Sequence, residues 1–451
     1  MINKIPFIGA IVKWLQNQGL DYGLPLVIWG FIQIILLFAF FNLPEIQIIA
    51  FLAATAPIWL PIMTGVLFFS RWMFMIGLAF AIDNGRTTLE IKLPPEVYKS
   101  PEAIEVVISQ IHNVQNPENL FQTYLDGKRP LTNSLEIVSK GGDVRFYINI
   151  PIKKIKTLLK ADLYSQYPGI EIQELNIDYT AEIPNDLNGY EMMSFHMGKK
   201  NSSAFPIRTY KEFGMDKLPK EEEKIDPLTP LLEAIGSIQP YERVWIQILI
   251  TPHRERGFKY GQLKKSPTWE KEVSAEVEKI MKKRSQKRTM TDGSEYETMT
   301  MLTPVERNTI ELMEENAQHY AYETAIRWIY ITPTGKFNGD TIGCVIRPFS
   351  QWDVQGRNGI GVRWRTDFNY KFYSDPFGTL IPALKKSELK SYKLRKYFNY
   401  TPADNTKIFT SVELASVYHF PGKVAVTPSL SRVTSTRGEA PGNLPTGNYE
   451  Y

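Results

Sequence analysis

The sequence contains almost no cysteine, and histidine is also scarce. Cys344 is the only cysteine among 451 residues, which excludes an internal disulfide framework and a cysteine-rich zinc site. The five histidines are scattered, and none of them pair at the spacing of metal ligands. We therefore expect neither a metal nor a cofactor.

Motifs for nucleotide binding and for nucleophilic catalysis are missing as well. The chain has no G-x-x-x-x-G-K-[ST] loop, no G-x-S-x-G motif and no H-E-x-x-H motif. Residues 356–361 (GRNGIG) carry two of the three glycines of a dinucleotide loop, but no strand-to-helix context surrounds them. No residue stands out as catalytic, so we expect a protein that is not an enzyme. A membrane-bound enzyme is the least favoured of three functional hypotheses.

Charge of either sign is nearly absent from the first 82 residues, although the whole chain holds 52 Lys and Arg against 48 Asp and Glu. Two uncharged apolar runs, 24–42 and 46–69, are each long enough to cross a bilayer as a helix. The link between them is short, which predicts a transmembrane helical hairpin over residues 24–82. Pro57 and Pro61 are expected to kink or break the second run. A buried hairpin in a soluble protein is the alternative.

Basic residues predict how this hairpin is oriented. Lys4, Lys13 and Arg71 flank it, whereas the loop between the two runs has no Lys or Arg. The positive-inside rule then places both termini and the large domain in the cytoplasm, at the inner membrane. Residues 1–23 suit an amphipathic segment lying on the membrane surface.

Residues 83–185 show the order of a ferredoxin-like domain. Strand patterns at 87–93, 131–139, 143–150 and 170–177 alternate with two helical patterns, at 101–111 and 152–165. This is the β-α-β-β-α-β arrangement. The fold class is therefore α+β.

A second, interrupted copy is predicted for residues 186–400. Its elements are strands at 206–213, 243–251, 322–332 and 360–368, helices near 229–238 and 339–350, and a helical insertion near 253–320. The insertion contains helical patterns near 268–285 and 303–319. Residues 401–451 are expected to form a short helix at 411–419 and then an extended tail rich in Pro, Gly and Ser.

Two basic clusters are the candidate phosphate contacts. The first extends over 254–288 and is densest at Lys282, Lys283, Arg284, Lys287 and Arg288. Nucleic acid or the anionic inner leaflet would suit it, but a solvated helix face balanced by nearby glutamates is favoured. The second cluster, 385–396, interleaves with tyrosines. That pattern fits single-stranded nucleic acid or, equally, a helix packed through its tyrosines.

Several long segments carry a family resemblance. These are 89–112 (LEIKLPPEVYKSPEAIEVVISQIH), 134–172, 226–250, 363–370 (RWRTDFNY) and 413–433 (ELASVYHFPGKVAVTPSLSRV). They resemble an uncharacterised membrane-anchored family of candidate-phylum bacteria. That family is similar to the membrane-proximal, N-terminal part of type IV secretion and conjugation ATPases. The motor domain of such ATPases, with its Walker A loop, has no counterpart here, so ATP hydrolysis is not carried over.

The resemblance implies a non-catalytic docking or assembly component of a type IV secretion-like or conjugative DNA-transfer machine. Its expected partners are the lipid bilayer and a separate ATPase, and an oligomer is expected. The alternative is a membrane-associated nucleic-acid-binding protein that uses the basic clusters 254–288 and 385–396. A steep loss of affinity with salt would distinguish this alternative.

Overall fold

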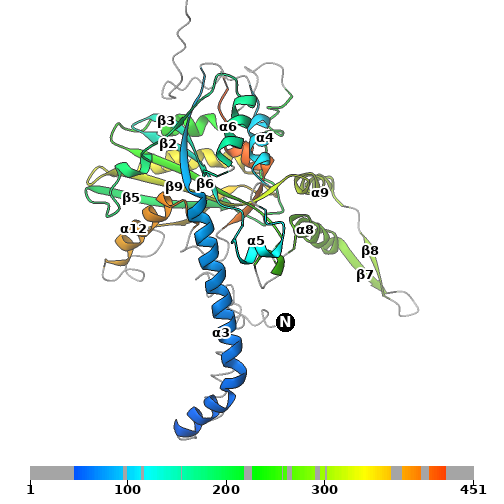
Figure 1. Ribbon diagram of the computed structural model, residues 1–451. Coiled ribbons are helices and arrows are strands. Elements are labelled where there is room, and N and C mark those ends of the chain that lie inside the picture. Colours follow the sequence, from blue (N-terminus) through cyan, green and yellow to red (C-terminus); the bar gives the residue numbers. More distant parts are fainter. Residues whose placement is uncertain are drawn as a thin grey trace, which may run out of the picture.

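Nine strands hydrogen-bond into one antiparallel sheet at the centre of the molecule (Figure 1). The computed structural model describes residues 45–94, 99–112, 116–153, 155–217, 226–255, 257–261, 267–289, 295–299, 302–366, 378–397 and 406–422. The predicted surface segment 1–23, the first apolar run 24–42 and the tail from 423 onward lie outside these residues. The mixture of helices with an antiparallel sheet confirms the α+β class.

The first half of the sheet follows the order predicted for residues 83–185. The elements are β1 (Arg86–Lys92), α4 (Glu102–Gln110), the short α5 (Leu120–Tyr124), β2 (Asn133–Lys140), β3 (Asp143–Pro151), α6 (Ile155–Gln166) and β4 (Glu171–Glu174). The strands lie in the spatial order β4-β1-β3-β2, and each neighbouring pair is antiparallel.

The second half has the spatial order β6-β9-β5-β10, again fully antiparallel. Its elements are β5 (Tyr190–Lys199), α7 (Thr229–Gly236), β6 (Arg243–Pro252), β9 (Ala321–Pro333), α10 (Gly339–Ile346), the 3₁₀ helix η5 (Arg347–Trp352) and β10 (Ile360–Arg365). The strand predicted at 206–213 is wrong, because those residues belong to no strand and β5 takes the expected place. The backbone N–H groups of Ile207 and Tyr210 donate to Glu413 and Ser416 instead of to a neighbouring strand.

The two halves join edge to edge through β2 and β6. Eight residues of each strand pair antiparallel, from Asn133 opposite Ile250 to Lys140 opposite Arg243. The order of strands is therefore mirrored on the two sides of this seam.

Both faces of the sheet are covered. A large apolar core packs one face against α4, α6, α7 and α13 (Ser411–Val417), which follows β11 (Lys407–Thr410). A smaller cluster on the other face includes Val138, Trp245 and Ile329. There α12 (Leu380–Lys393) and the 3₁₀ helix η2 (Tyr179–Glu182) supply the cover.

The insertion after β6 extends from the body as an arm (Figure 1). It consists of α8 (Trp269–Arg284), β7 (Ser285–Thr289), β8 (Glu295–Met299) and α9 (Pro304–Ala317), preceded by the 3₁₀ helix η4 (Phe258–Tyr260). Trp269, Val273 and Met313 pack its two helices onto Ala321 at the start of β9. The two predicted helices of the insertion are therefore present, and a hairpin joins them.

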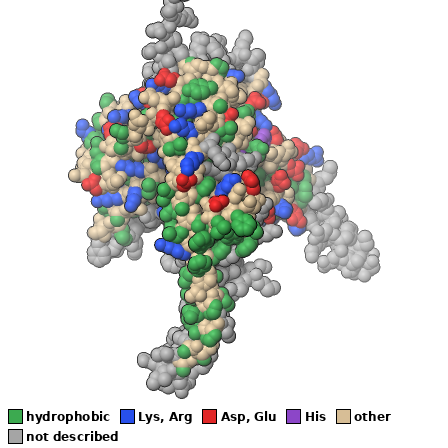
Figure 2. Space-filling model, in the orientation of Figure 1, with side chains coloured by type: hydrophobic (Ala, Val, Ile, Leu, Met, Phe, Trp, Pro, Cys, Tyr) green, Lys and Arg blue, Asp and Glu red, His purple; other side chains and the backbone are tan. Residues whose placement is uncertain are grey.

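A single long helix, α3 (Glu45–Asn84), extends from the body like a stalk (Figure 1). Pro57 and Pro61 lie inside α3 and do not end it. The stretch from Trp59 to Asn84 is long and apolar enough to cross a membrane, and little of it is buried. Figure 2 shows hydrophobic side chains along the stalk and where it meets the body. Gly85 alone separates α3 from β1, so the helix continues directly into the sheet.

Candidate functional site

A row of polar side chains crosses the sheet under α12, on the face of the smaller apolar cluster. Gln247 of β6 lies directly opposite both Glu136 of β2 and Arg327 of β9. Arg327 in turn lies opposite His196 of β5. All four side chains are 1% exposed or less. The row therefore passes through the seam between the two halves, where burial of unpaired polar groups would be costly.

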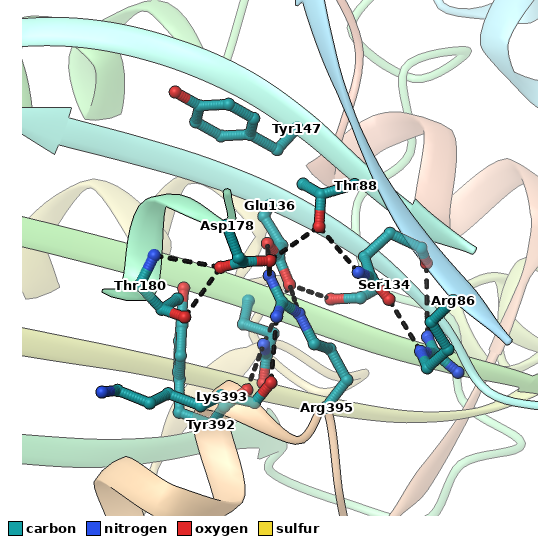
Figure 3. A network of polar contacts seen from close by, with 12 residues as sticks. Arg86, Thr88, Ser134, Glu136, Tyr147, Asp178, Thr180, Tyr392, Lys393 and Arg395 are labelled. Carbon is teal, nitrogen blue, oxygen red and sulfur yellow. Dashed lines mark hydrogen bonds and ion pairs between the residues drawn. The ribbon is translucent and has the colours of Figure 1, made fainter. Parts of the chain in front are cut away.

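Glu136 is the centre of the row (Figure 3). Its carboxylate accepts hydrogen bonds from Ser134 Oγ at 2.6 Å, Gln247 Nε2 at 3.0 Å and Tyr179 Oη at 2.8 Å. Arg395 adds a bidentate pair, with Nε at 3.0 Å and Nη2 at 3.1 Å. Burial by itself would raise the pKa of Glu136, but the charge and hydrogen bonds of Arg395 hold it below the ordinary value. Glu136 is therefore ionised at neutral pH.

Arg395 links Glu136 to a second carboxylate. Its Nη2 lies 2.8 Å from Asp178 Oδ2, which also accepts from Thr88 Oγ1 at 2.7 Å. The other oxygen of Asp178 accepts from the backbone and the hydroxyl of Thr180. Arg395 has a φ of 51°, a left-handed conformation that costs energy for a residue with a side chain. The network holds the backbone in this conformation just beyond the end of α12.

A second buried group lies farther along the row. Glu388 of α12 is 2.8 Å from His196 Nε2 and 3.6 Å from Arg327 Nη1. Burial lowers the pKa of His196, so its neutral ring donates the hydrogen bond to Glu388. Burial would raise the pKa of Glu388, and His196 with Arg327 holds it low. The ring of His196 also stacks on Trp364 of β10, with 4.4 Å between ring centroids.

The arrangement fixes each group in one protonation state at neutral pH. The carboxylates of Glu136, Asp178 and Glu388 have lowered pKa values, and burial raises the pKa of Tyr179 and Tyr392 far from neutrality. A general acid or base needs a pKa near the working pH, and none of these groups has one. The chemistry of the network is therefore that of a clamp, which fastens α12 and Arg395 across the seam.

An open groove of about 580 Å³ adjoins this clamp on the first half of the sheet. Tyr147 and Trp245 form its floor, and both pack against the ring of Tyr179. Its charged lining is paired internally, because Lys140 lies 2.9 Å from Glu182 and Arg145 lies 2.7 Å from Asp143. The groove therefore presents balanced charge and an aromatic floor.

The cluster predicted on the insertion lies at the far part of the arm. Lys282 and Lys283 are exposed near the end of α8, and Lys282 lies 2.8 Å from Glu278. Arg284 ends α8, while Lys287 and Arg288 belong to β7, opposite Glu297 and Tyr296 in register. The cluster is therefore divided between a helix and a strand that both have acidic neighbours.

The second predicted cluster, 385–396, is largely used to attach α12. Tyr392 is fully buried, and Tyr397 Oη hydrogen-bonds Thr251 at 2.6 Å. Lys393 Nζ donates to the carbonyl of Ile183, and Arg395 pairs with Glu136. These tyrosines are therefore packing groups and are not free to stack on bases.

Sequence reasoning missed the clamp, although a signal exists. Each of four apolar strands carries one large polar residue on the same face, as in SLEIVS with Glu136, VWIQILI with Gln247, TAIRWIYI with Arg327 and MSFHMG with His196. A lone polar residue in a buried strand requires a partner inside the protein.

Comparison with known families gives one match. A family model described as a domain of unknown function, DUF8128, matches residues 77–340, which is more than half of the chain. The match begins in the last turns of α3 and ends at the start of α10. No curated protein matches the chain.

Proposed function

The chain belongs to the DUF8128 family, and we propose that it is a membrane-anchored, non-catalytic component that docks other proteins at the cytoplasmic membrane face. In this proposal it assembles part of a type IV secretion-like or conjugative DNA-transfer machine and acts with a separate ATPase. The observation that carries the proposal is the direct continuation of the exposed apolar helix α3 into β1, inside the sheet.

This continuity supports an anchoring role on mechanical grounds. β1 pairs with β3 on one side and β4 on the other, so it is an interior strand. A force or displacement at α3 is therefore transmitted to the whole sheet. The clamp at Glu136 and Arg395 fastens the two halves across their seam, as a rigid platform requires.

The proposal includes two finer points of architecture. Residues 24–42 form a first span, so that α3 is the second span and both termini are cytoplasmic. Each half of the sheet is a ferredoxin-like unit. The orders β4-β1-β3-β2 and β10-β5-β9-β6, both wholly antiparallel, support this.

Docking is supported by the surfaces that the body offers. The sheet order ends at β4, which is mostly exposed, and at β10, in which half of the residues are exposed, and strands at sheet edges readily pair with other chains. The arm formed by α8 and α9 also projects from the body (Figure 1). These features fit a component that assembles into an oligomer and contacts a motor.

The experiment is a pull-down of the full chain from gently solubilised native membranes, with and without nuclease, analysed by mass spectrometry. We expect a secretion-type ATPase that remains after nuclease treatment. A matched variant, Lys282→Glu with Lys283→Glu, should recover the same ATPase, because both side chains are exposed on the arm. Recovery of nucleic acid without an ATPase, lost in this variant, would contradict the proposal and favour direct nucleic-acid binding.

A further inference from the structure

The body contacts α3 just beyond the uncharged run that ends before Arg71. Trp72 Nε1 donates to the carbonyl of Tyr124 in α5 at 2.7 Å. The hydroxyl of Tyr124 donates to the carbonyl of Phe258 in η4 at 2.5 Å. Gly127 approaches the backbone of Ile76 so closely that a Cβ would collide with its carbonyl. These contacts hold α5 and η4 beside α3, and we call these two elements the collar.

The collar is apolar on its outer surface. Leu120, Phe121, Leu125 and Phe258 are 48%, 74%, 60% and 62% exposed. The apolar surface in Figure 2 continues from the stalk onto the adjoining part of the body. Exposed apolar side chains next to a membrane-spanning helix suit the boundary between head groups and acyl chains. The collar therefore belongs at the membrane surface.

A pocket of about 390 Å³ lies behind the collar, against α3. Lys128, Arg129 and Arg254 line it together with Gly77 of α3. The guanidinium of Arg129 lies over Gly77, where a side chain would occupy its place. Nε and Nη2 of Arg254 are buried and make no hydrogen bond with any residue that the structure describes. Two buried guanidinium nitrogens in this state are costly unless a ligand supplies acceptors.

Two carboxylates, Glu255 and Glu323, also line the pocket. Glu323 lies 3.4 Å from His253 Nδ1, and Lys128 lies 3.6 Å from Glu118 outside the pocket. Burial lowers the pKa of Arg254 to about 10, which leaves it protonated at neutral pH. The two arginines therefore provide forked cationic donors, which match the geometry of a phosphate group.

We propose that this pocket binds the phosphate of an anionic phospholipid, with the acyl chains lying along α3 and the apolar collar. The inference rests on the proposed function in one respect, namely that α3 crosses the membrane. Met73, Phe74 and Gly77 of α3 line the pocket just beyond the uncharged run that ends before Arg71, so the pocket lies where the head groups begin if that run crosses the bilayer. Lys128, Arg129 and Arg254 give the charge that an anionic head group needs.

The test uses the full chain in a neutral detergent, titrated separately with short-chain phosphatidylglycerol, phosphatidylcholine of the same chain length and inorganic phosphate. The readout is the unfolding temperature. We expect half-saturation at a concentration about tenfold or more lower for phosphatidylglycerol than for phosphatidylcholine. The double variant Arg129→Gln, Arg254→Gln should weaken phosphatidylglycerol binding about tenfold or more, because charge-assisted hydrogen bonds are lost.

Two further variants act as controls. Lys271→Gln with Lys283→Gln removes the same charge from exposed positions of α8 and should bind like the wild type. Arg254→Lys keeps the charge and should bind more tightly than Arg254→Gln. The pocket assignment is overturned if the double variant binds like the wild type. The lipid assignment is overturned if inorganic phosphate gives the same shift at the same concentration as phosphatidylglycerol.

An alkaline carbonate wash of membranes separates this inference from the proposed function. Wild type in the supernatant would refute membrane anchoring itself. Wild type in the pellet, together with equal lipid binding by the double variant, would refute only the pocket.

Discussion

Replacing Glu136 with glutamine is the most informative perturbation of the clamp. The side chain is completely buried and forms a bidentate pair with Arg395. Glutamine keeps the shape but removes the charge, and its amide group cannot accept the hydrogen bonds that one carboxylate oxygen now receives. The variant leaves Arg395 buried with Asp178 as its ionic partner among the residues that the structure describes.

The expected loss can be judged from this geometry. Removing one partner of a buried ion pair costs about 3–5 kcal/mol in the free energy of unfolding. Asp178 remains 2.8 Å from Arg395 and compensates in part, so we expect a value near the lower limit, about 3 kcal/mol. The control Glu171→Gln removes a carboxylate that is 53% exposed and pairs with Lys92. That change should cost about 1 kcal/mol or less.

Urea unfolding of the full chain in detergent micelles provides the assay. The chain has nine tryptophans, and one of them, Trp245, lies 5.4 Å from Tyr179 and 5.5 Å from Tyr392 between ring centroids, so tryptophan fluorescence includes a signal from beside the clamp. The pH dependence gives an independent check. Because the folded-state pKa of Glu136 is below the ordinary value of 4.5, its contribution is complete above that pH and is lost on acidification through the folded-state value.

The difference between wild type and Glu136→Gln should therefore be constant from pH 7 to pH 5 and shrink at lower pH. A loss no larger than that of Glu171→Gln would refute the assignment of Glu136 as the centre of the clamp. A difference that does not change with acid would show that the charge of Glu136 is not what stabilises the fold.

Three further predictions follow from other parts of the structure. Gly127→Ala should destabilise the protein by more than Gly189→Ala in urea unfolding. Both glycines have a positive φ, but only at Gly127 would the added Cβ collide with backbone, that of Ile76. The Gly189 change should cost about 1 kcal/mol. Wild type should be less stable at pH 5.5 than at pH 7.5 by up to about 1.4 kcal/mol in the free energy of unfolding, because the pKa of His196 is lower in the folded chain and the unfolded chain therefore binds a proton first as the pH falls. The variant His196→Gln should remove this difference. Lys282→Glu with Lys283→Glu should leave DNA retention at low salt unchanged, because nearby glutamates already balance this cluster; lost retention would instead favour a nucleic-acid interface.

Elements with clear periodicity could be predicted from the sequence. The strand at 243–251 and the helix opened by Thr229 and Pro230 are found as β6 and α7. The two helical patterns of the insertion are found as α8 and α9, and in the structure Thr303 forms a capping box with Glu306 at the start of α9. Local signals of this kind survive in the tertiary structure because packing agrees with them.

β5 could not be recognised in the same way. Met192, Met193, Phe195 and Met197 are buried on both faces of the sheet, so the strand lacks the alternation that marks a half-exposed strand. The segment 206–213 has more strand-like local composition, but the backbone N–H groups of Ile207 and Tyr210 donate to residues of α13 more than 200 positions away. Contacts at that separation leave no local signal in the sequence.

The clamp shows a different limit of sequence reasoning. Glu136 and Arg395 are separated by 259 positions, so neither residue predicts the other. The basic residues at 385–396 suggested an external anion, yet the structure pairs Arg395 with an internal carboxylate. Composition records that a cation is present, whereas only the fold decides whether its partner lies inside or outside the protein.

The central claim, a large cytoplasmic domain anchored by α3, can be tested directly with the natural single cysteine. Cys344 is exposed on α10, so a membrane-impermeant maleimide can reach it without any substitution. The account predicts labelling of Cys344 in inverted inner-membrane vesicles, no labelling in intact spheroplasts, and retention of the labelled chain in the pellet after an alkaline carbonate wash. Labelling from the outside of intact spheroplasts, or release of the chain by carbonate, would contradict it.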